Sequence, residues 1–419
     1  TKGKLIFSSV PMAPPLAITG CAVRTPLEHI SNALILVDRG VVSYVGPIGS
    51  RPIPSDAEIL DLGGLLACPG FIDLQVNGLD DNAVMAAEAA GVRGMAAELA
   101  SRGTTSFLPT LTTSSKDHLL ASASAVRQAW ETLEKENTPS SSILGVHLEG
   151  PYFSKMMAGA HPPEHIRPID LEEIERIAEA AGGWGEEGRP GLRLVTLSPE
   201  LGGAPEAVRW LGERGVLAAM GHTAASADRV ENFLSAGGAF AVHAYNRYGS
   251  PGEAGSPEAK PPDHRSPGPM ASVSSDPRLM AGIIADGVHV HPEIVSEFIQ
   301  KKGWFRTVLT SDLVSGGGLS GEENAQTSGF AVKRGGILTG SRLSVGEMIP
   351  LIKKWRRLDD SRILALATWN PAKLLGSPGK RGCLRPGARA DICFLDPDSL
   401  EVSTVMAGGE WVSGSPPHG

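Results

Sequence analysis

The 419-residue sequence predicts an α/β fold, a (β/α)8 TIM-like barrel with a small β-sandwich domain built from both termini. Two observations support this expectation. Short, almost continuously apolar runs alternate with helix-like stretches between residues 65 and 376, and the sequence texture changes at both ends of that span. Runs without polar alternation are typical of parallel strands that are buried on both faces.

Eight apolar runs are the expected strands of the barrel. They are 65–76, 104–113, 141–150, 192–200, 215–223, 239–246, 279–287 and 306–313. The amphipathic stretches between them are expected helices, the clearest being 83–102, 116–136, 171–180 and 226–237. Eight β-then-α units match a (β/α)8 barrel. An open doubly wound sheet is the alternative, but its usual GxGxxG first turn is absent from this sequence.

The two ends of the sequence have a different pattern. Residues 15–63 and 384–413 contain short alternating segments, which predict antiparallel strands joined by turns. Because both ends flank the barrel, we expect one small domain made from 1–64 and 377–419, with the barrel spanning 65–376. Residues 248–270 are too rich in proline and glycine for a helix and predict a long loop.

Composition excludes some classes of function. Lys plus Arg is 38 and Asp plus Glu is 46, and the net charge of -8 comes without a run of five like charges. This balance argues against a nucleic-acid groove. No stretch approaches the roughly 20 apolar residues of a membrane helix. The four cysteines form no CxxC pair, which favours free thiols in a reducing, cytoplasmic location.

Coordinating residues follow several of the expected strands. Glu149 ends the third run, His222 the fifth, His243 the sixth and Asp312 the eighth. Active sites of such barrels lie where the strands end. One carboxylate and two imidazoles suit a borderline divalent metal and leave a coordination position open for water. Asp312, across the barrel, could then act as general base to that water.

Each of these residues also has a structural interpretation. His147 fits a hydrogen-bonded core histidine, and we favour that role for it. The same interpretation applies to His222 and His243, but each follows a wholly apolar strand, which favours the ligand role. A buried Glu149 is costly unless it meets a cation, and no neighbouring strand end supplies an arginine. Asp312 could instead cap a turn.

Two neutral amides end the first run. Gln75 and Asn77 are spaced i and i+2, so both point to one face of a strand. Amides are weak ligands for a transition metal but good hydrogen-bonding groups. Three ligands lie on later strands, so we expect one divalent ion per chain rather than two.

A set of motifs runs through nearly the whole chain in one order. It comprises PGFIDLQVNG, GTTSFLPTL, GVHLEGPY, GAHPPEH, VTLSPE, GHT, IADGVHVHP, ATWNPAKLLG and GCLRPGARADICFLD. In these motifs the sequence resembles the N-acetylglucosamine-6-phosphate deacetylases, a family of the amidohydrolase superfamily. The resemblance implies a barrel with a small β-sandwich, a homodimer, and hydrolysis of the acetamide of N-acetyl-D-glucosamine 6-phosphate to D-glucosamine 6-phosphate and acetate.

The resemblance also implies a metal site. Its ligands would be Glu149, His222 and His243, a set that favours zinc and that iron, manganese or cobalt can also occupy. Gln75 and Asn77 stand where binuclear amidohydrolases hold a second metal through two histidines, so that position is replaced by amides.

Further roles follow from the same motifs. Asp312 would be the base that activates water and later protonates the leaving amine, and His289 would hold the substrate and polarise the acetamide carbonyl. His161 would contact the sugar. Asn246 and Arg265 would meet the phosphate, with Arg265 reaching the site of the neighbouring subunit.

The sequence departs from the family pattern after His243. Residues 243–248 read HAYNRY where the family has HLFNAM or HLYNAM, so Arg247 replaces a small residue beside the phosphate. Arg247 either adds a phosphate contact or crowds the site. Residues 249–263 and the TSDL of the eighth run also differ from the family pattern. The alternatives are therefore a deacetylase of N-acetylgalactosamine 6-phosphate or another N-acyl compound, or a non-catalytic barrel that binds a sugar phosphate. Retention of Asp312 argues against the last.

Overall fold

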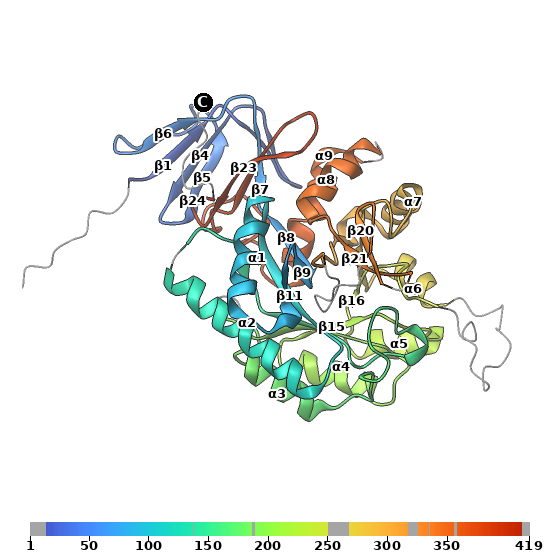
Figure 1. The fold of residues 1–419 in the computed structure, drawn as a ribbon. Helices are drawn as coiled ribbons and strands as arrows, with labels where there is room; N and C mark the ends of the chain where they lie inside the picture. The colour runs from blue at the N-terminus through green and yellow to red at the C-terminus, as the bar shows by residue number, and fades with distance from the viewer. Residues whose placement is uncertain are drawn as a thin grey trace, which may run out of the picture.

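A barrel of parallel strands with two small sheets beside it forms the protein (Figure 1). The computed structural model describes residues 14–136, 138–186, 189–249, 268–316, 326–334, 336–355 and 358–412. The predicted fold class is confirmed. No helix in the described ranges is long and apolar enough to cross a membrane.

Eight strands of the described chain follow one another around the barrel. They are β8 (Phe71–Val76), β11 (Thr104–Thr112), β13 (Val146–Glu149), β14 (Leu192–Leu197), β15 (Leu217–Met220), β16 (Phe240–Ala241), β17 (Met280–Ile283) and β18 (Thr307–Leu309). A short strand, β12 (Ser142–Ile143), pairs with the N-terminal half of β11. Each apolar run predicted from the sequence contains one barrel strand.

The first apolar run holds two strands instead of one. Its first half is β7 (Leu66–Pro69), which belongs to a terminal sheet, and its second half is the barrel strand β8. The chain passes between them at Gly70, where an added Cβ would lie 2.1 Å from Thr105 Oγ1. Only glycine permits this close approach, which the apolar pattern alone does not reveal.

Helices cover the outside of the barrel. In the described chain they are α1 (Ala89–Ser101), α2 (Lys116–Glu136), α3 (Leu171–Ala181), α4 (Ala204–Gly212), α5 (Ala227–Ser235), α6 (Pro269–Ser275), α7 (Pro292–Lys302), α8 (Val345–Lys354), α9 (Asp360–Ala365) and α10 (Trp369–Leu374). Short 3₁₀ helices are η1 (Val84–Ala86), η2 (Lys155–Met157) and η3 (Trp304–Arg306). Local signals set the ends: Asp170 caps α3 by accepting from the Glu173 N–H, and Gly182 ends it with a φ of 111°.

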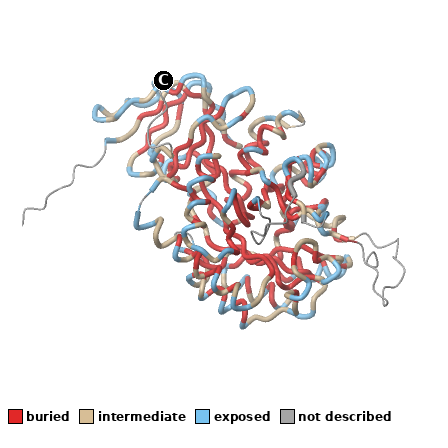
Figure 2. Tube along the Cα trace, in the orientation of Figure 1, coloured by how far each residue is buried: buried red, intermediate tan, exposed pale blue. Residues whose placement is uncertain are grey.

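Two layers of apolar side chains stabilise the barrel. Leu74, Leu108, Leu194 and Phe240 fill its interior, while a larger cluster packs the strands against the helices. Figure 2 shows the strands buried and the outer helix faces exposed. This rigid frame holds the strand ends in place.

The barrel closes between its first and last strands at the end that carries the polar residues. Val76 and Leu313 form a parallel bridge, and the Asn77 N–H donates to the Leu313 carbonyl at 2.8 Å. Deeper in the same seam, the buried Asp73 carboxylate accepts from the Ser311 hydroxyl and, at 3.2 Å, from the Ser311 N–H. The segment after β18 is thereby fixed beside the end of β8.

The small domain is a sandwich of two sheets. One has the strand order β5 (Val41–Pro47), β4 (Ala33–Asp38), β1 (Leu16–Thr19), β6 (Glu58–Asp61). The other has the order β24 (Glu410–Trp411), β23 (Val402–Ala407), β22 (Ile392–Leu395), β7, β2 (Ala22–Arg24), β3 (His29–Ile30), and therefore combines both ends of the chain. Ile18, Ile35, Phe394 and Met406 pack between the two sheets. The predicted domain limits at residues 64 and 377 stay a prediction.

Two further small sheets were not predicted from the sequence. One pairs β9 (Gly78–Leu79) with β10 (Asn82–Ala83). The other contains β19 (Gln326–Ser328), β20 (Ala331–Arg334) and β21 (Ile337–Ser341). It is attached to the barrel through a bridge between Leu313 and Ser341. Most of the predicted loop 248–270 lies outside the described residues.

Candidate metal centre

Four of the residues predicted from the sequence meet at the carboxyl ends of the barrel strands. Glu149 is the last residue of β13, His222 and His243 follow β15 and β16, and Asp312 follows β18. Glu149, His222 and His243 are at most 5% exposed, while Asp312 is partly accessible. Parallel strands end at one edge, which is why residues distant in the sequence gather there.

Left-handed backbone turns aim three of these side chains. His222, His243 and Asp312 have φ angles of 48°, 25° and 49°. Such angles are uncommon for residues other than glycine and cost about 1–3 kcal/mol each. The surrounding fold maintains them, and each turn directs a polar side chain away from the strand line into a common site.

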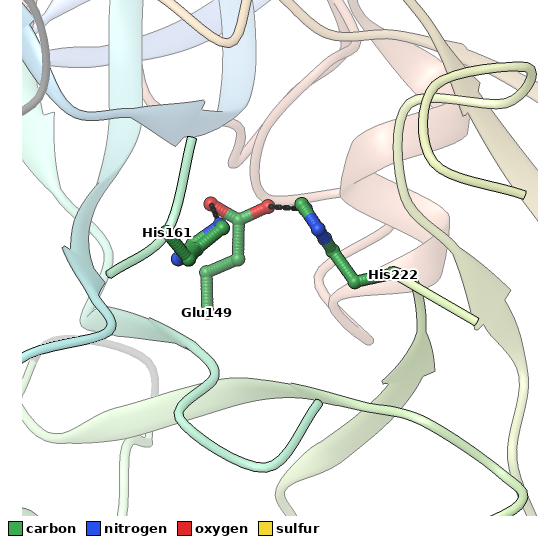
Figure 3. A group of neighbouring side chains, drawn as sticks. All are labelled: Glu149, His161 and His222. Atoms are coloured by element: carbon green, nitrogen blue, oxygen red, sulfur yellow. Dashed lines mark ion pairs between the residues drawn. The ribbon is translucent and has the colours of Figure 1, made fainter. Parts of the chain in front are cut away.

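A buried group of metal-ligating atoms lies at the centre of the site. One ligand atom each from Glu149, His161 and His222 lie within 4.8 Å of one another (Figure 3). The Glu149 carboxylate is between the two imidazoles, 3.8 Å from His222 Nε2 and 4.0 Å from His161 Nε2. His243 Nε2 is closer, 2.9 Å from Glu149 Oε1. One oxygen and several imidazole nitrogens are a donor set that suits a divalent transition metal.

The hydrogen bonds of the imidazoles distinguish their roles. His222 donates from Nδ1 to the Met157 carbonyl at 2.9 Å, so its Nε2 faces Glu149 as a lone pair when the ring is neutral. His161 differs, because its Nδ1 accepts from the Thr113 N–H at 3.4 Å, which places the proton of the neutral ring on Nε2. A buried lone pair that faces a carboxylate is unfavourable unless a cation lies between them. His222 and Glu149 form such a pair.

Burial dominates the protonation of this group. It lowers the pKa of His161 to about 4 and the pKa of His222 well below its ordinary value, helped by the other imidazoles. Burial acts most strongly against the charged forms of Glu149 and His243, but their hydrogen bond and the nearby opposite charges together outweigh it, so that the pKa of Glu149 is lowered and that of His243 is raised. The ionised Glu149 and the neutral His222 are in the protonation states that metal binding requires, whereas His243 would have to release its proton to serve as a ligand.

Gln75 and Asn77 hold the two acidic side chains of the site. Gln75 Nε2 donates to Glu149 Oε1 at 2.6 Å and to Asp312 Oδ1 at 3.1 Å, and Asn77 Nδ2 donates to the same Asp312 oxygen at 2.7 Å. The amide of Gln75 therefore bridges two carboxylates. Burial, together with the nearby Glu149 charge, raises the pKa of Asp312 to about 6.

A cavity of about 670 Å³ opens above the group. The predicted residues on its wall are Glu149, His161, His222, His243, Asn246, Arg247, His289 and Asp312. Its volume lies within the roughly 300–1,000 Å³ typical of small-molecule sites. The β21 residues Leu338 and Thr339 line the cavity as well, although the sequence analysis assigned no element there. The GG turn before an alternating run, residues 335–340, was the available signal.

The candidate phosphate residues are partly described. Asn246 donates weakly to the carbonyls of His243 and Ala244, at 3.3 and 3.4 Å. Arg247 is exposed on the cavity wall and packs against Gly159, where an added Cβ would lie 2.7 Å from its Nε. Within the described chain its guanidinium has no hydrogen bond or ion pair. Arg265 lies outside the described residues.

His147 has the structural role that we favoured. It is fully buried beneath the site, with Nδ1 3.1 Å from the Leu74 carbonyl and Nε2 2.8 Å from the Thr196 hydroxyl. Burial lowers its pKa to about 4, so the ring is neutral and both nitrogens serve the fold. The sequence analysis missed Asp73, which joins the first and last strands, because the side chain lies within an apolar run.

Comparisons with known proteins place this site in a family. The Amidohydrolase family matches residues 66–412. The chain therefore belongs to the amidohydrolase family.

Within this family, the chain is similar to deacetylases of N-acetylated amino sugar phosphates. The chain is 29% identical to N-acetylglucosamine-6-phosphate deacetylase of Bacillus subtilis strain 168 over 405 residues, covering 95% of this chain and 97% of that protein. It is 31% identical to N-acetylgalactosamine-6-phosphate deacetylase of Escherichia coli O157:H7 over 383 residues, 89% of this chain and 93% of that protein. Among solved structures, a point mutant of Mycobacterium smegmatis N-acetyl-D-glucosamine-6-phosphate deacetylase, in complex with N-acetyl-D-glucosamine-6-phosphate, superposes with a TM-score of 0.81 at 29% identity. That match covers 95% of this chain and 99% of the solved chain. The predicted resemblance is confirmed.

Proposed function

We propose that the protein hydrolyses the acetamide of N-acetyl-D-glucosamine 6-phosphate to D-glucosamine 6-phosphate and acetate. The observation that carries this proposal is the buried Glu149–imidazole group beside Asp312, at the floor of a cavity that a sugar phosphate fits. Support also comes from the likeness to deacetylases over nearly the whole chain, one of them a complex with that sugar phosphate.

Glu149, His222 and His243 are the proposed ligands of one divalent ion per chain, with zinc favoured and iron, manganese or cobalt able to use the same atoms. Bound there, the ion would lower the pKa of water and polarise the acetamide carbonyl. His222 presents Nε2 because its Nδ1 donates to the Met157 carbonyl. His161 is assigned to the substrate instead, because the Thr113 N–H occupies its Nδ1 and leaves an Nε2–H donor at the cavity wall.

Asp312 is the proposed proton carrier. Both amide contacts hold Oδ1, from Asn77 and Gln75, so Oδ2 is the oxygen left to take a proton from the attacking water. The same carboxyl group can then return the proton to the amine as the C–N bond breaks. His289, which lines the same cavity, is proposed to donate a hydrogen bond to the acetamide oxygen as negative charge develops on it.

The phosphate is proposed to bind near Asn246 and Arg247. A guanidinium without an acidic partner in the described chain, on the wall of a cavity with a carboxylate floor, suits the distant anionic end of the substrate. A homodimer in which Arg265 reaches the neighbouring site remains part of the proposal, as does a cytoplasmic location.

The galacto epimer is a second candidate substrate. The relative from Escherichia coli O157:H7 that carries this activity in its name is 31% identical to the chain, as similar as the gluco enzymes. The replacement of a small residue by Arg247 lies in the segment that would contact the sugar phosphate, so the sugar preference has to be measured directly.

Acetate release tests the proposal. Purified protein should be assayed for metal content and for acetate release from the 6-phosphates of N-acetylglucosamine and N-acetylgalactosamine, with and without a chelator. We expect release that the chelator abolishes and added metal restores. Binding of the sugar phosphate by metal-loaded protein without any acetate release would contradict an enzymatic function.

A further inference from the structure

A carboxylate outside the predicted set lies directly behind His289. Asp286 is 2% exposed and follows β17 at the rim of the site. Its Oδ2 is 2.7 Å from His289 Nδ1, while its Oδ1 accepts from the N–H groups of Val288 at 2.8 Å and His289 at 2.9 Å. All three of the hydrogen bonds described for this carboxylate are to one turn and one imidazole.

This arrangement determines which nitrogen of His289 carries a proton. An ionised carboxylate can accept hydrogen bonds but cannot donate them. The Nδ1 that faces it therefore has to carry the hydrogen. Burial raises the pKa of Asp286, but the hydrogen bonds from His289 and the turn outweigh it, and its pKa lies below the ordinary value. Nε2 is then the nitrogen that His289 offers to the cavity.

We propose that Asp286 is a positioning residue, which fixes the ring orientation of His289 and holds a proton on its Nδ1, so that His289 donates from Nε2 to the acetamide oxygen as an imidazolium paired with the Asp286 carboxylate. This proposal rests on the proposed function for its catalytic consequence. The physical reason is that a buried negative charge 2.7 Å from Nδ1 stabilises positive charge on the ring when oxygen in the cavity becomes negative.

Replacement of Asp286 by asparagine tests this role. Asp286→Asn keeps an oxygen that can accept from the Val288 and His289 N–H groups, so the turn should persist. Its amide can donate to Nδ1, however, which removes the proton from that nitrogen, and it lacks the negative charge that pairs with an imidazolium. We expect acetate release to fall about 100-fold in kcat, with metal content unchanged and KM altered only a few-fold. Asp359→Asn is the matched control, because Asp359 also accepts a backbone N–H, that of Arg362 at 3.0 Å, but lies at the start of α9.

A double-mutant cycle and a spectroscopic measurement distinguish a role of Asp286 that acts through His289 from a role that only stabilises the turn. If Asp286 acts through His289, adding Asp286→Asn to His289→Gln should cause no further loss of kcat. In ¹⁵N-histidine spectra, Nδ1 of His289 should be protonated in the wild type and unprotonated in Asp286→Asn. If Asp286→Asn fails to fold, Asp286→Ser retains a short acceptor for the turn but cannot reach Nδ1, and the same loss is expected.

The outcomes are distinguishable from failure of the proposed function. Activity of Asp286→Asn within threefold of the wild type, additive losses in the cycle, or an unchanged tautomer would each overturn the positioning role. Absence of acetate release by the metal-loaded wild type would overturn the function, while the tautomer measurement would still decide whether Asp286 controls His289.

Discussion

Replacing Gln75 by methionine should lower the free energy of unfolding of the metal-free protein by more than most single substitutions do. The side chain donates one hydrogen bond to Glu149 and one to Asp312, and both Gln75 and Glu149 are buried. Methionine has a similar length and is apolar, so it keeps the packing. It cannot donate a hydrogen bond, however, so the carboxylates of Glu149 and Asp312 each lose one donor.

The magnitude follows from these two contacts. A hydrogen bond to a charged group contributes about 1.5–3 kcal/mol, so losing two costs about 3–6 kcal/mol. Asp312 keeps its bond from Asn77 and Glu149 keeps its bond from His243, which places the expected loss near the lower end, about 3 kcal/mol. For a chain of this size that corresponds to roughly 3 °C in the unfolding midpoint.

Thermal unfolding of chelated and metal-loaded protein is the assay. Gln128→Met is the matched control, because Gln128 is exposed on α2. Metal-loaded Gln75→Met should lose less than the chelated form, since a cation held by Glu149 compensates that carboxylate. A chelated midpoint no lower than that of Gln128→Met would refute the bridging role of the Gln75 amide.

Four further changes test other parts of the site. Asp312→Asn should reduce acetate release by at least about 1,000-fold with metal content unchanged, because an amide cannot accept the proton; loss of metal would contradict its assigned role. His243→Asn should lose most of the metal whereas His161→Asn should keep it, as measured by elemental analysis. Arg247→Ala should raise KM for the sugar phosphate about 10- to 100-fold with less effect on kcat, if the guanidinium contacts phosphate. Burial raises the pKa of Asp73 to about 6, so the folded chain retains a proton that the unfolded chain releases near pH 4. The stability that Asp73 contributes therefore falls by about 2 kcal/mol as the pH rises from 4 to 6, and Asp73→Asn should remove that fall in urea unfolding.

Controls and contradicting results differ among these variants. Equal metal loss from His161→Asn and His243→Asn would reject the tautomer argument that separates the two imidazoles. An unchanged KM in Arg247→Ala would move the phosphate away from that wall. For Asp73, the wild type and Asp73→Asn should be compared at each pH, so that other titrating groups cancel; parallel stability curves would contradict the assigned pKa.

Hydrophobic pattern alone was enough to predict the barrel. Parallel strands buried on both faces need apolar side chains at every position, and the eight runs satisfy that requirement. The runs containing Glu149, His222 and His243 could be aligned at one edge because all strands of such a barrel end on the same side. The interpretation of His147 as structural also held, and its two nitrogens meet partners on the strands β8 and β14.

Hydrogen bonds across the barrel could not be predicted from the sequence. Gln75 and Asn77 were recognised as unusual, but their contacts with Asp312 cross the seam between the first and last strands, more than 230 residues apart. The break of the first run at Gly70 depends on a contact with Thr105 in a neighbouring strand. Such contacts depend on register and strand order, which composition and spacing leave open.

The sequence by itself determined which chemical groups stand at the strand ends: carboxylates, imidazoles and, after the first strand, two neutral amides. Only the tertiary structure decided which role each of these side chains has. Tautomers and charge states depend on distances of about 3 Å between side chains from different strands. The Thr113 N–H distinguishes His161 from His222, and Asp286 orients His289. The physical reason is that hydrogen bonds are directional and short-ranged, whereas the hydrophobic pattern that builds the barrel is neither.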